Sequence, residues 1–369
     1  MLSLALRFTA IPKLICEDIG VQQSSSSSLP SVSYVMPVLN EADYLASAVN
    51  AVLAQRYPAA TELILALAHS TDGTAEIAEA LAAADPRVRI VANPARDISA
   101  GLNTAIAAAI HPVIVRVDAH SELSDNYTET AVRSLLSSGA ANVGGIMQAR
   151  GKTPVQRVIA ACYNSPAGLG GGAYHGAEKA HPADSAYLGV FWRDAWQLVG
   201  GFDETVRRGE DWEFNLRIRL AGKTVWFNPD LRVFYSPRSS FAALAKQFFA
   251  TGVWRAMLVK RHPKLHPLRY FVPGLLVLFL ALTALVIALT AIPALTPVLV
   301  WVSVPALLIC LLYFAALTLT ACRLPGLSLR ERLLAPFSFL TMHTAWGLGF
   351  LRGFCFGTGD TVDRSRLSV

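Results

Sequence analysis

The sequence predicts an α/β fold, in which a mainly parallel sheet carries helices on both faces, followed by C-terminal transmembrane helices. Short apolar segments alternate with segments of helical periodicity between residues 31 and 117. Three of the apolar segments end in clusters of polar residues. Two long uncharged stretches follow residue 269. We therefore expect one soluble domain and one membrane-embedded region in the same chain.

The composition agrees with this division. The 369 residues are 53% hydrophobic and 16% charged, and the mean hydropathy of +0.41 is high for a soluble protein of this size. The formal charge is +6, but basic residues gather just before the apolar stretches, and no basic-aromatic groove pattern accompanies them. The charge therefore indicates a membrane surface as partner, and no nucleic acid. The five cysteines lack paired spacing and predict neither a disulfide framework nor a zinc site.

Residues 1–30 are predicted to form a flexible N-terminal leader. Charged residues interrupt its apolar runs, and the five serines at 24–28 precede the first expected strand. The apolar runs are too short for the core of a signal peptide. We therefore expect the soluble domain to stay in the cytosol.

The soluble domain is predicted to cover residues 31–238. Its strands are expected at 33–38, 61–68, 88–91 and 113–117, and its helices at 42–55, 75–84 and 98–109. Such alternation favours right-handed crossovers and a mainly parallel sheet covered on both faces. A further helix is expected at 210–221, where Gly222 ends it.

Polar residues follow three of these strands, at the edge where open α/β sheets bind ligands. The first strand ends in the segment 37–41, the second is followed by 70–74, and the fourth by Asp118-Ala119-His120. The first two segments have structural alternatives, as a helix cap and as an Asx turn. Asp118 and His120, spaced i and i+2, lie on one side of the chain. They can hold a divalent cation that neutralises a diphosphate leaving group.

Two acids, Glu210 and Asp211, open the helix at 210, where the N-terminal amides stabilise their charge. The structural alternative is first-turn capping, with Glu213 and Arg217 as an ordinary i, i+4 pair. An inverting sugar transfer needs a carboxylate that accepts the proton of the acceptor hydroxyl. Asp211 is the candidate base.

The glycine-rich run 168–172 has no strand immediately before it and no clear helix after it. It therefore does not predict a dinucleotide site. Because glycine permits large backbone changes, the run indicates a mobile loop over the acceptor.

The C-terminal part divides into three regions. Residues 239–269 mix aromatic and basic side chains, which predicts an interfacial amphipathic segment. The uncharged stretches 270–292 and 295–321 are each long enough to span a bilayer, and the basic residues that follow return the chain to the cytoplasmic side. The stretch 333–351 can span, re-enter or lie flat, and we favour spanning. The transmembrane region 270–352 thus has two or three helices, and 353–369 form a tail.

Taken together, the segments 37–41, 70–74, 118–120, 200–204 and 210–212 resemble the family 2 glycosyltransferases. Within this family, the branch related to succinoglycan glucosyltransferases is the one that Arg116 to His120 and the segment 247–263 resemble. The resemblance implies the GT-A fold, Asp118 and His120 at the metal and diphosphate, and Asp211 as the base, with Glu210 beside it. It also implies a donor site made of Pro37, Asn40, Glu41, Asp72, Arg96, Asn103, Asp118, Gln247, Trp254 and Arg255. Of these residues, Gln247, Trp254 and Arg255 belong to a segment that closes over the nucleotide sugar.

This sequence departs from the family pattern at two places. Residues 67–69 are Leu-Ala-His, where the family often carries an acidic pair that reads the base, so a UDP-sugar is only the default donor. Gln247 and Trp254 are seven residues apart, unlike the compact Gln-x-x-Arg-Trp of processive synthases. This spacing indicates the addition of a single sugar. Imidazole suits Mn²⁺ better than the harder Mg²⁺, so His120 predicts a preference for manganese.

The expected function is therefore an inverting transfer of one hexose to a lipid-linked saccharide acceptor, in cell-surface polysaccharide or glycolipid synthesis. We expect a multi-pass protein of the cell inner membrane with its catalytic domain in the cytoplasm. Two alternatives stay open. One is a polyprenyl-phosphate sugar synthase, and the other is a non-catalytic membrane subunit with a degenerate transferase domain.

Overall fold

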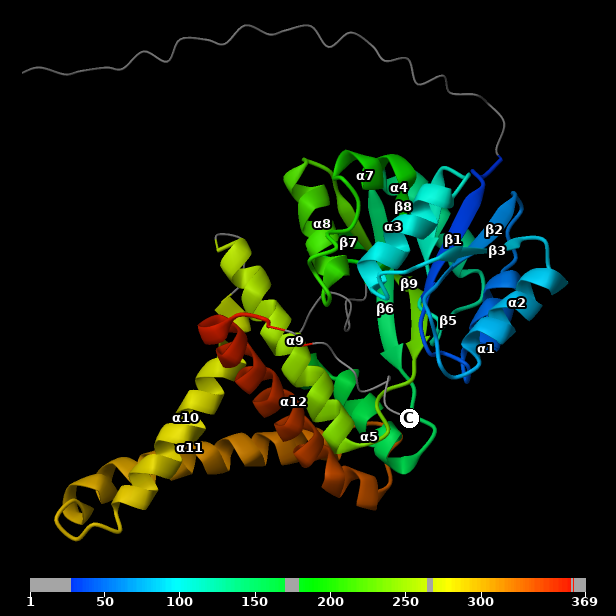
Figure 1. The fold of residues 1–369 in the computed structure, drawn as a ribbon. Helices are drawn as coiled ribbons and strands as arrows, with labels where there is room; N and C mark the ends of the chain where they lie inside the picture. The colour runs from blue at the N-terminus through cyan, green and yellow to red at the C-terminus, as the bar shows by residue number, and fades with distance from the viewer. Residues whose placement is uncertain (1–27, 170–178, 264–267, 360, 362–369) are drawn as a thin grey trace, which may run out of the picture.

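The computed structural model describes residues 28–169, 179–263, 268–359 and 361 (Figure 1). Most of the predicted leader and most of the glycine-rich run lie outside the described residues. The rest forms a sheet with helices on both faces, joined to a group of long helices at its lower edge in Figure 1.

One half of the sheet is parallel, as predicted. Its four strands pair in the order β3-β2-β1-β4, and each crossover between them contains one helix. The strands are β1 (Val32–Val38), β2 (Thr61–Leu67), β3 (Val88–Ala92) and β4 (Val113–Arg116). The crossover helices are α1 (Leu45–Leu53), α2 (Thr74–Ala84) and α3 (Ile98–Ala108).

The other half of the sheet is mixed. The order continues β8-β6-β9-β5, with β8 antiparallel to both β4 and β6, while β9 is parallel to β6 and antiparallel to β5 and β7. These strands are β5 (Ser121–Leu123), β6 (Asn142–Ala149), β7 (His181–Pro182), β8 (Tyr187–Trp192) and β9 (Val225–Tyr235). The carboxyl ends of β1, β2, β4, β6 and β9 lie at one edge of the sheet, which faces the long helices (Figure 1).

Two apolar layers hold the sheet between its helices. On one face, α1 and α4 (Tyr127–Ser138) bury residues such as Leu45, Val49 and Val132. On the other face, α3 and α8 (Glu210–Leu220) bury Ile106 and Phe214. Short helices α5 (Pro154–Tyr163), α6 (Pro166–Leu169) and α7 (Arg193–Leu198) complete the domain.

The predicted interfacial segment is a 21-residue helix, α9 (Phe241–Arg261), which is packed on two sides. Leu244 and Phe248 contact α5 and α12 (Leu329–Phe356), whereas Trp254 and Leu258 contact α8. Helices α9 and α12 lie side by side in Figure 1. The structure thus makes α9 a shared element of the catalytic domain and of the helices behind it.

Two helices among the described residues are long and apolar enough to cross a membrane, Leu268–Leu289 and Thr296–Arg323, with hydropathies of 2.7 and 2.5. They contain α10 (Val272–Leu289) and α11 (Thr296–Arg323), which project from the body as a hairpin (Figure 1). In their most apolar windows, only 11% and 6% of the residues are buried.

The favoured third span, 333–351, is not among the candidate membrane helices of the described chain. It lies within α12, where Phe339, Met342 and Phe350 pack on neighbouring helices. The physical reason for the difference is that a helix–helix interface and a lipid-facing surface are both apolar. Small residues such as Gly349 make the stretch look like a membrane span in the sequence, but in the structure they allow α12 to approach α9 closely.

Candidate active site

The turns that follow β1 and β2 are joined by hydrogen bonds. The backbone N–H of Asn40 donates to Ser70 Oγ (3.1 Å), and Asn40 Oδ1 accepts from the N–H of Thr71 (2.9 Å). Asp72 Oδ2 accepts from the N–H of Ala42 (3.2 Å). Burial alone would raise the pKa of Asp72, but these hydrogen bonds and those from Thr74 lower it. Two predicted donor-site residues, Asn40 and Asp72, thus hold the turns together.

A groove of about 470 Å³ lies beside the second of these turns. It is lined by Leu67, Ala68, His69, Ser70, Thr71, Gly73, Ala75 and Glu76. It therefore includes the positions where the expected acidic pair is replaced by apolar residues and a histidine.

A buried arginine connects the acids that follow β4 with those that open α8. Arg116, 4% exposed, donates from Nε (3.2 Å) and Nη2 (3.1 Å) to Asp118 Oδ1. Its Nη2 also donates to Glu210 Oε1 (2.7 Å). Asp118, the predicted metal ligand, and Glu210, the first acid of α8, are 92 residues apart in the sequence. Both therefore bind the same guanidinium group.

Asp211 follows at the first turn of α8, where its Oδ1 accepts from the N–H of Trp212 (2.7 Å). Loss of contact with water raises the pKa of Asp211, and the neighbouring charge of Glu210 raises it further. Arg116 and Arg255 oppose this rise. The carboxylate is thus a stronger base than an ordinary aspartate.

His120 is oriented by the turn that follows β1. Its Nδ1 lies 2.9 Å from Glu41 Oε1, and its ring meets Tyr235 edge-on, with the centroids 6.1 Å apart. The Tyr235 hydroxyl accepts from Gln247 Nε2 (3.0 Å) on α9. When Nδ1–H is donated to Glu41, the Nε2 lone pair is available to a ligand. Gln247 thus contacts Tyr235, which in turn contacts His120, and Gln247 has an indirect connection to the site.

Asp118 and His120 fit a divalent cation that is bound together with a phosphate ligand. Their side chains are 17% and 20% exposed, and Asp118 Oδ2 and His120 Nε2 make no hydrogen bond with the described residues. In the described parts of the chain, no three His, Cys, Asp or Glu residues gather into a complete metal site. One carboxylate and one imidazole suit a cation that takes its other ligands from water and a diphosphate.

Two further predicted donor-site residues on α9 are engaged with the protein. Trp254 is buried, and its Nε1 donates to the carbonyl oxygen of Thr361 (2.7 Å) near the C-terminus. The Arg255 guanidinium lies over the rings of Trp212 (5.0 Å) and Tyr270 (4.9 Å). Of the two, Arg255 is close enough to Asp211 to stabilise its charge.

The remaining predicted residues lie around α3. Pro37 packs near Gly101, where an added Cβ would lie 3.4 Å from the Pro37 side chain. Arg96 is exposed, in the left-handed backbone region with φ of 56°.

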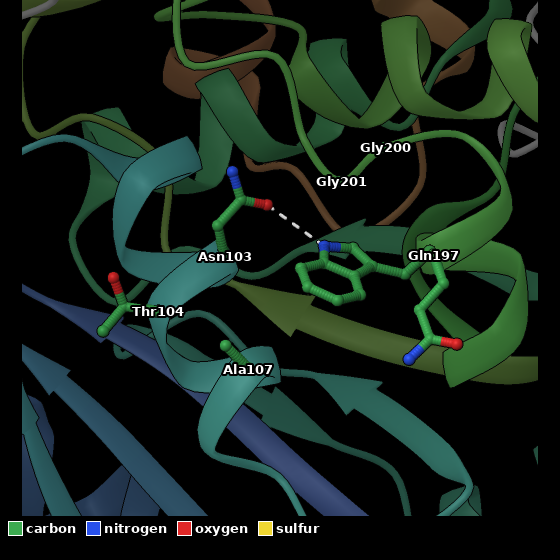
Figure 2. Close-up of a pocket in the computed structure, with 7 residues that line it drawn as sticks. Asn103, Thr104, Ala107, Gln197, Gly200 and Gly201 are labelled. Atoms are coloured by element: carbon green, nitrogen blue, oxygen red, sulfur yellow. Dashed lines mark hydrogen bonds between the residues drawn. The ribbon is translucent and has the colours of Figure 1, made fainter.

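The structure gives Asn103 a scaffold position, which differs from the expected donor contact. It lines a groove of about 510 Å³ between α3 and α7. Figure 2 shows the lining side chains, with one hydrogen bond of Asn103 as a dashed line. Its Oδ1 accepts from Trp196 Nε1 (3.1 Å) and from the N–H of Phe202 (2.8 Å), and its Nδ2 donates to Phe202 O and Glu204. The physical reason is helical geometry, because Asn103 lies about 1.4 turns beyond the start of α3 and faces α7.

Arg116 and Tyr235 are two residues of the site for which the sequence predicts no role. A signal for Arg116 was present, since it is a charged residue at the end of the otherwise apolar strand Val-Ile-Val-Arg-Val. Tyr235 carries no such signal, because an aromatic residue at a strand end is ordinary.

Comparison with known proteins shows what the chain is similar to. Residues 33–176 match the family described as Glycosyl transferase family 2. The chain is 33% identical to the succinoglycan biosynthesis protein ExoA of Rhizobium meliloti over 89% of this chain and 97% of that protein. It is 28% identical to the glycosyltransferase AglE of Haloferax volcanii, over 62% and 73% of the two chains.

Among solved structures, the fold resembles a mannosyltransferase from Pyrobaculum calidifontis in complex with GDP-Man and Mn²⁺. The TM-score is 0.58 with 20% sequence identity, covering 89% of this chain and 88% of that one. This likeness confirms the predicted GT-A fold.

Proposed function

The chain belongs to glycosyltransferase family 2, and from this premise we propose that it moves one hexose, with inversion, from a nucleotide-diphosphate sugar to a lipid-linked saccharide acceptor. It is a glycosyltransferase, and its relatives include a succinoglycan biosynthesis protein and another glycosyltransferase. The observation that carries the finer proposal is the shared contact of Asp118 and Glu210 with Arg116. It brings Asp118, the proposed metal and diphosphate ligand, close to the acids of α8.

Asp118 and His120 would hold a divalent cation with the donor's diphosphate. When bound, the cation neutralises the negative charge that builds up on the departing diphosphate. Asp118 offers Oδ2 while Arg116 holds Oδ1, and His120 offers Nε2 while Glu41 holds Nδ1. The solved mannosyltransferase was captured with Mn²⁺ and GDP-Man, which supports a metal-dependent reaction here.

Asp211 would act as the general base. Its carboxylate takes the proton of the acceptor hydroxyl while that oxygen forms a bond to the anomeric carbon. The bond from this carbon to the diphosphate breaks on the opposite face, so the configuration inverts. The raised pKa of Asp211 suits this role because a stronger base accepts the proton more readily.

The α10–α11 hairpin would anchor the enzyme in the inner membrane, with the catalytic domain in the cytoplasm. Large apolar side chains on both helices are exposed, including Leu275, Leu282, Leu308 and Leu311. Exposed apolar surface of this extent is stable in lipid and not in water. An acceptor on a lipid carrier would then be presented near α9 and α12, from which the hairpin projects and which the carboxyl edge of the sheet faces (Figure 1).

The test is a donor screen on membranes that contain the protein, with radiolabelled UDP-sugars and GDP-sugars and Mn²⁺. We expect label in extractable lipid for one donor, and loss of that label in Asp211→Asn. Asp125→Asn, an exposed aspartate outside the site, is the matched control and should keep activity.

Two outcomes would contradict parts of the proposal. Near-normal turnover in Asp211→Asn would favour a polyprenyl-phosphate acceptor, since a phosphate nucleophile needs no strong base. Label that appears only in soluble saccharide would exclude the lipid-linked acceptor.

A further inference from the structure

Arg116 is a buried residue of the site that has no role of its own in the proposed sugar transfer. It lies at the end of β4, is 4% exposed, and binds one oxygen of Asp118 and one of Glu210. Burial alone would lower the pKa of its guanidinium, but the carboxylates of Asp118, Glu210 and Asp211 raise it. All three acids therefore act on the same cation.

The charges of this cluster do not balance within the protein. Arg116 acts on three carboxylates and Arg255 acts on one of them, Asp211, which leaves one negative charge in excess when all are ionised. A divalent cation would compensate this excess. Arg116 would then bind Asp118 Oδ1 and Glu210, and the metal would bind the remaining oxygen of Asp118.

The arrangement is not optimised for stability alone. Arg116 Nη1 is buried and has no hydrogen-bond partner within the described parts of the chain. A buried donor without a partner destabilises the folded state and so lowers the free energy of unfolding. Buried ion pairs often stabilise less than apolar residues of similar size would. A role beyond scaffolding explains why an arginine occupies the interior here.

We propose that Arg116 is a positioning residue that joins the metal ligand Asp118 and the base Asp211 into one unit, by holding Asp118 directly and Asp211 through its neighbour Glu210. This inference rests on the proposed sugar transfer. Fixing Glu210 in the first turn of α8 fixes Asp211 next to it, so the base and the diphosphate end of the site keep a set separation. That separation decides whether the acceptor oxygen can reach the anomeric carbon in line with the departing diphosphate.

The planar guanidinium is required for this task. Nε and Nη2 both reach Asp118, and Nη2 also reaches Glu210. The ammonium group of a lysine keeps the positive charge but is a single point that lacks the rigid fork. Arg116→Lys therefore removes the geometry while it preserves the charge.

The test compares Arg116→Lys with Arg217→Lys in the full-length protein. Arg217 is a matched control because it also lies in an ion pair with an acid of α8, Glu213 (2.7 Å), without contact to Asp118. The measurements are kcat, the KM for the donor, Mn²⁺ affinity in the presence of UDP by calorimetry, and the unfolding temperature. We expect kcat at saturating Mn²⁺ to fall about 100-fold in Arg116→Lys, a loss larger than any change in Mn²⁺ affinity explains, with donor KM and unfolding temperature close to those of Arg217→Lys.

Two results would overturn the inference. One is unchanged kcat in Arg116→Lys, while the wild type transfers sugar and Asp211→Asn does not. The other is a loss of Mn²⁺ affinity that accounts for the loss of kcat, because Arg116 would then only shape the metal site. A wild type that transfers no sugar from any donor would instead contradict the proposed function itself.

A second variant keeps the test decisive when Arg116→Lys folds poorly. Glu210→Gln retains a hydrogen-bond acceptor for Arg116 but removes the charge. Because Arg116 acts on Asp211 through Glu210, Glu210→Gln alone should lower kcat with little change in unfolding temperature. Where Arg116→Lys folds, the double variant should be no slower than the slower single variant. Unchanged kcat in Glu210→Gln, or losses that multiply in the double variant, would overturn the inference.

Discussion

His120 Nδ1 lies 2.9 Å from Glu41 Oε1, so the acid that follows β1 orients the histidine that follows β4. The two residues are 79 positions apart in sequence and meet because β1 and β4 pair in parallel. This contact fixes which ring nitrogen faces a ligand, and it gives Glu41 a task that differs from direct contact with the nucleotide.

Glu41→Gln is expected to weaken Mn²⁺ binding about 10- to 100-fold, as for other residues that orient a metal-binding histidine. The reason is that an amide holds the imidazole less firmly than a carboxylate does. Calorimetry with Mn²⁺ and UDP measures the effect, and saturating Mn²⁺ should restore much of kcat. Glu79→Gln, an exposed acid on α2, is the control. Equal Mn²⁺ affinity in Glu41→Gln and Glu79→Gln would contradict the assignment.

The wild type is expected to turn over faster with saturating Mn²⁺ than with saturating Mg²⁺, because imidazole is a poorer ligand for the harder ion. His120→Asp should reduce this preference, since it supplies an oxygen ligand. Initial rates over a range of each ion measure it. Equal saturating rates in the wild type would disprove the preference, and full activity in His120→Ala would remove its basis.

The pH dependence of kcat/KM should have an acidic limb that belongs to Asp211. A base works only when deprotonated, so activity rises with pH through its pKa. Desolvation and the charge of Glu210 place that pKa above the usual aspartate value of about 3.9. In Glu210→Gln the limb should move to lower pH, because one of the two causes that raise the pKa is gone. A limb that stays in place, or moves upward, would contradict this assignment.

Asn103→Ala is expected to lower stability without changing the donor KM. The substitution leaves the N–H of Phe202 and the indole N–H of Trp196 without their acceptor, at a cost of about 1–3 kcal/mol. Thermal unfolding and donor kinetics measure the two effects. Thr104→Ala, in the same groove, is the control. A raised donor KM with unchanged stability would restore Asn103 to the donor site.

Gly349→Ala is expected to destabilise the protein by about 1–3 kcal/mol through overpacking. A Cβ at this position would collide with the carbonyl oxygen of Phe249 on α9. At Gly274 an added Cβ meets its nearest neighbour at 3.4 Å, an ordinary contact, so Gly274→Ala is the control. Thermal unfolding in detergent measures both, and equal unfolding temperatures would contradict the close packing of α12 on α9.

The sequence predicted the parallel half of the sheet because alternation along the chain determines it. Strands β1 to β4 follow one another with one helix in each crossover, so their order needs only local information. Strand β8 enters the sheet beside β4, more than 70 residues later, and runs antiparallel to it. That pairing depends on long-range packing, which periodicity does not encode.

The candidate site was predictable to the same extent. Asp118, His120 and Asp211 carry recognisable motifs, whereas the contacts of Arg116 with Glu210 and of Glu41 with His120 join distant segments. Asn103 and Trp254 lie in segments with the expected pattern, but in the structure their side chains hydrogen-bond to other parts of the protein. Residue type and spacing locate a ligand-binding edge, and the direction of each side chain follows only from the packed fold.

The double contact of α9, with α8 on one side and with α5 and α12 on the other, has a consequence for any shortened form of the enzyme. A fragment that ends at residue 238 would leave Val158, Ile159 and Trp212 facing water, because their partners come from the helices that follow. The catalytic domain, α9 and α12 therefore form one packed unit. A water-soluble version would have to retain α9 and α12 and lose only the α10–α11 hairpin. Its linker would have to run back along most of α12, because α9 and α12 are parallel and Arg261 lies at the opposite end of the pair from Leu329.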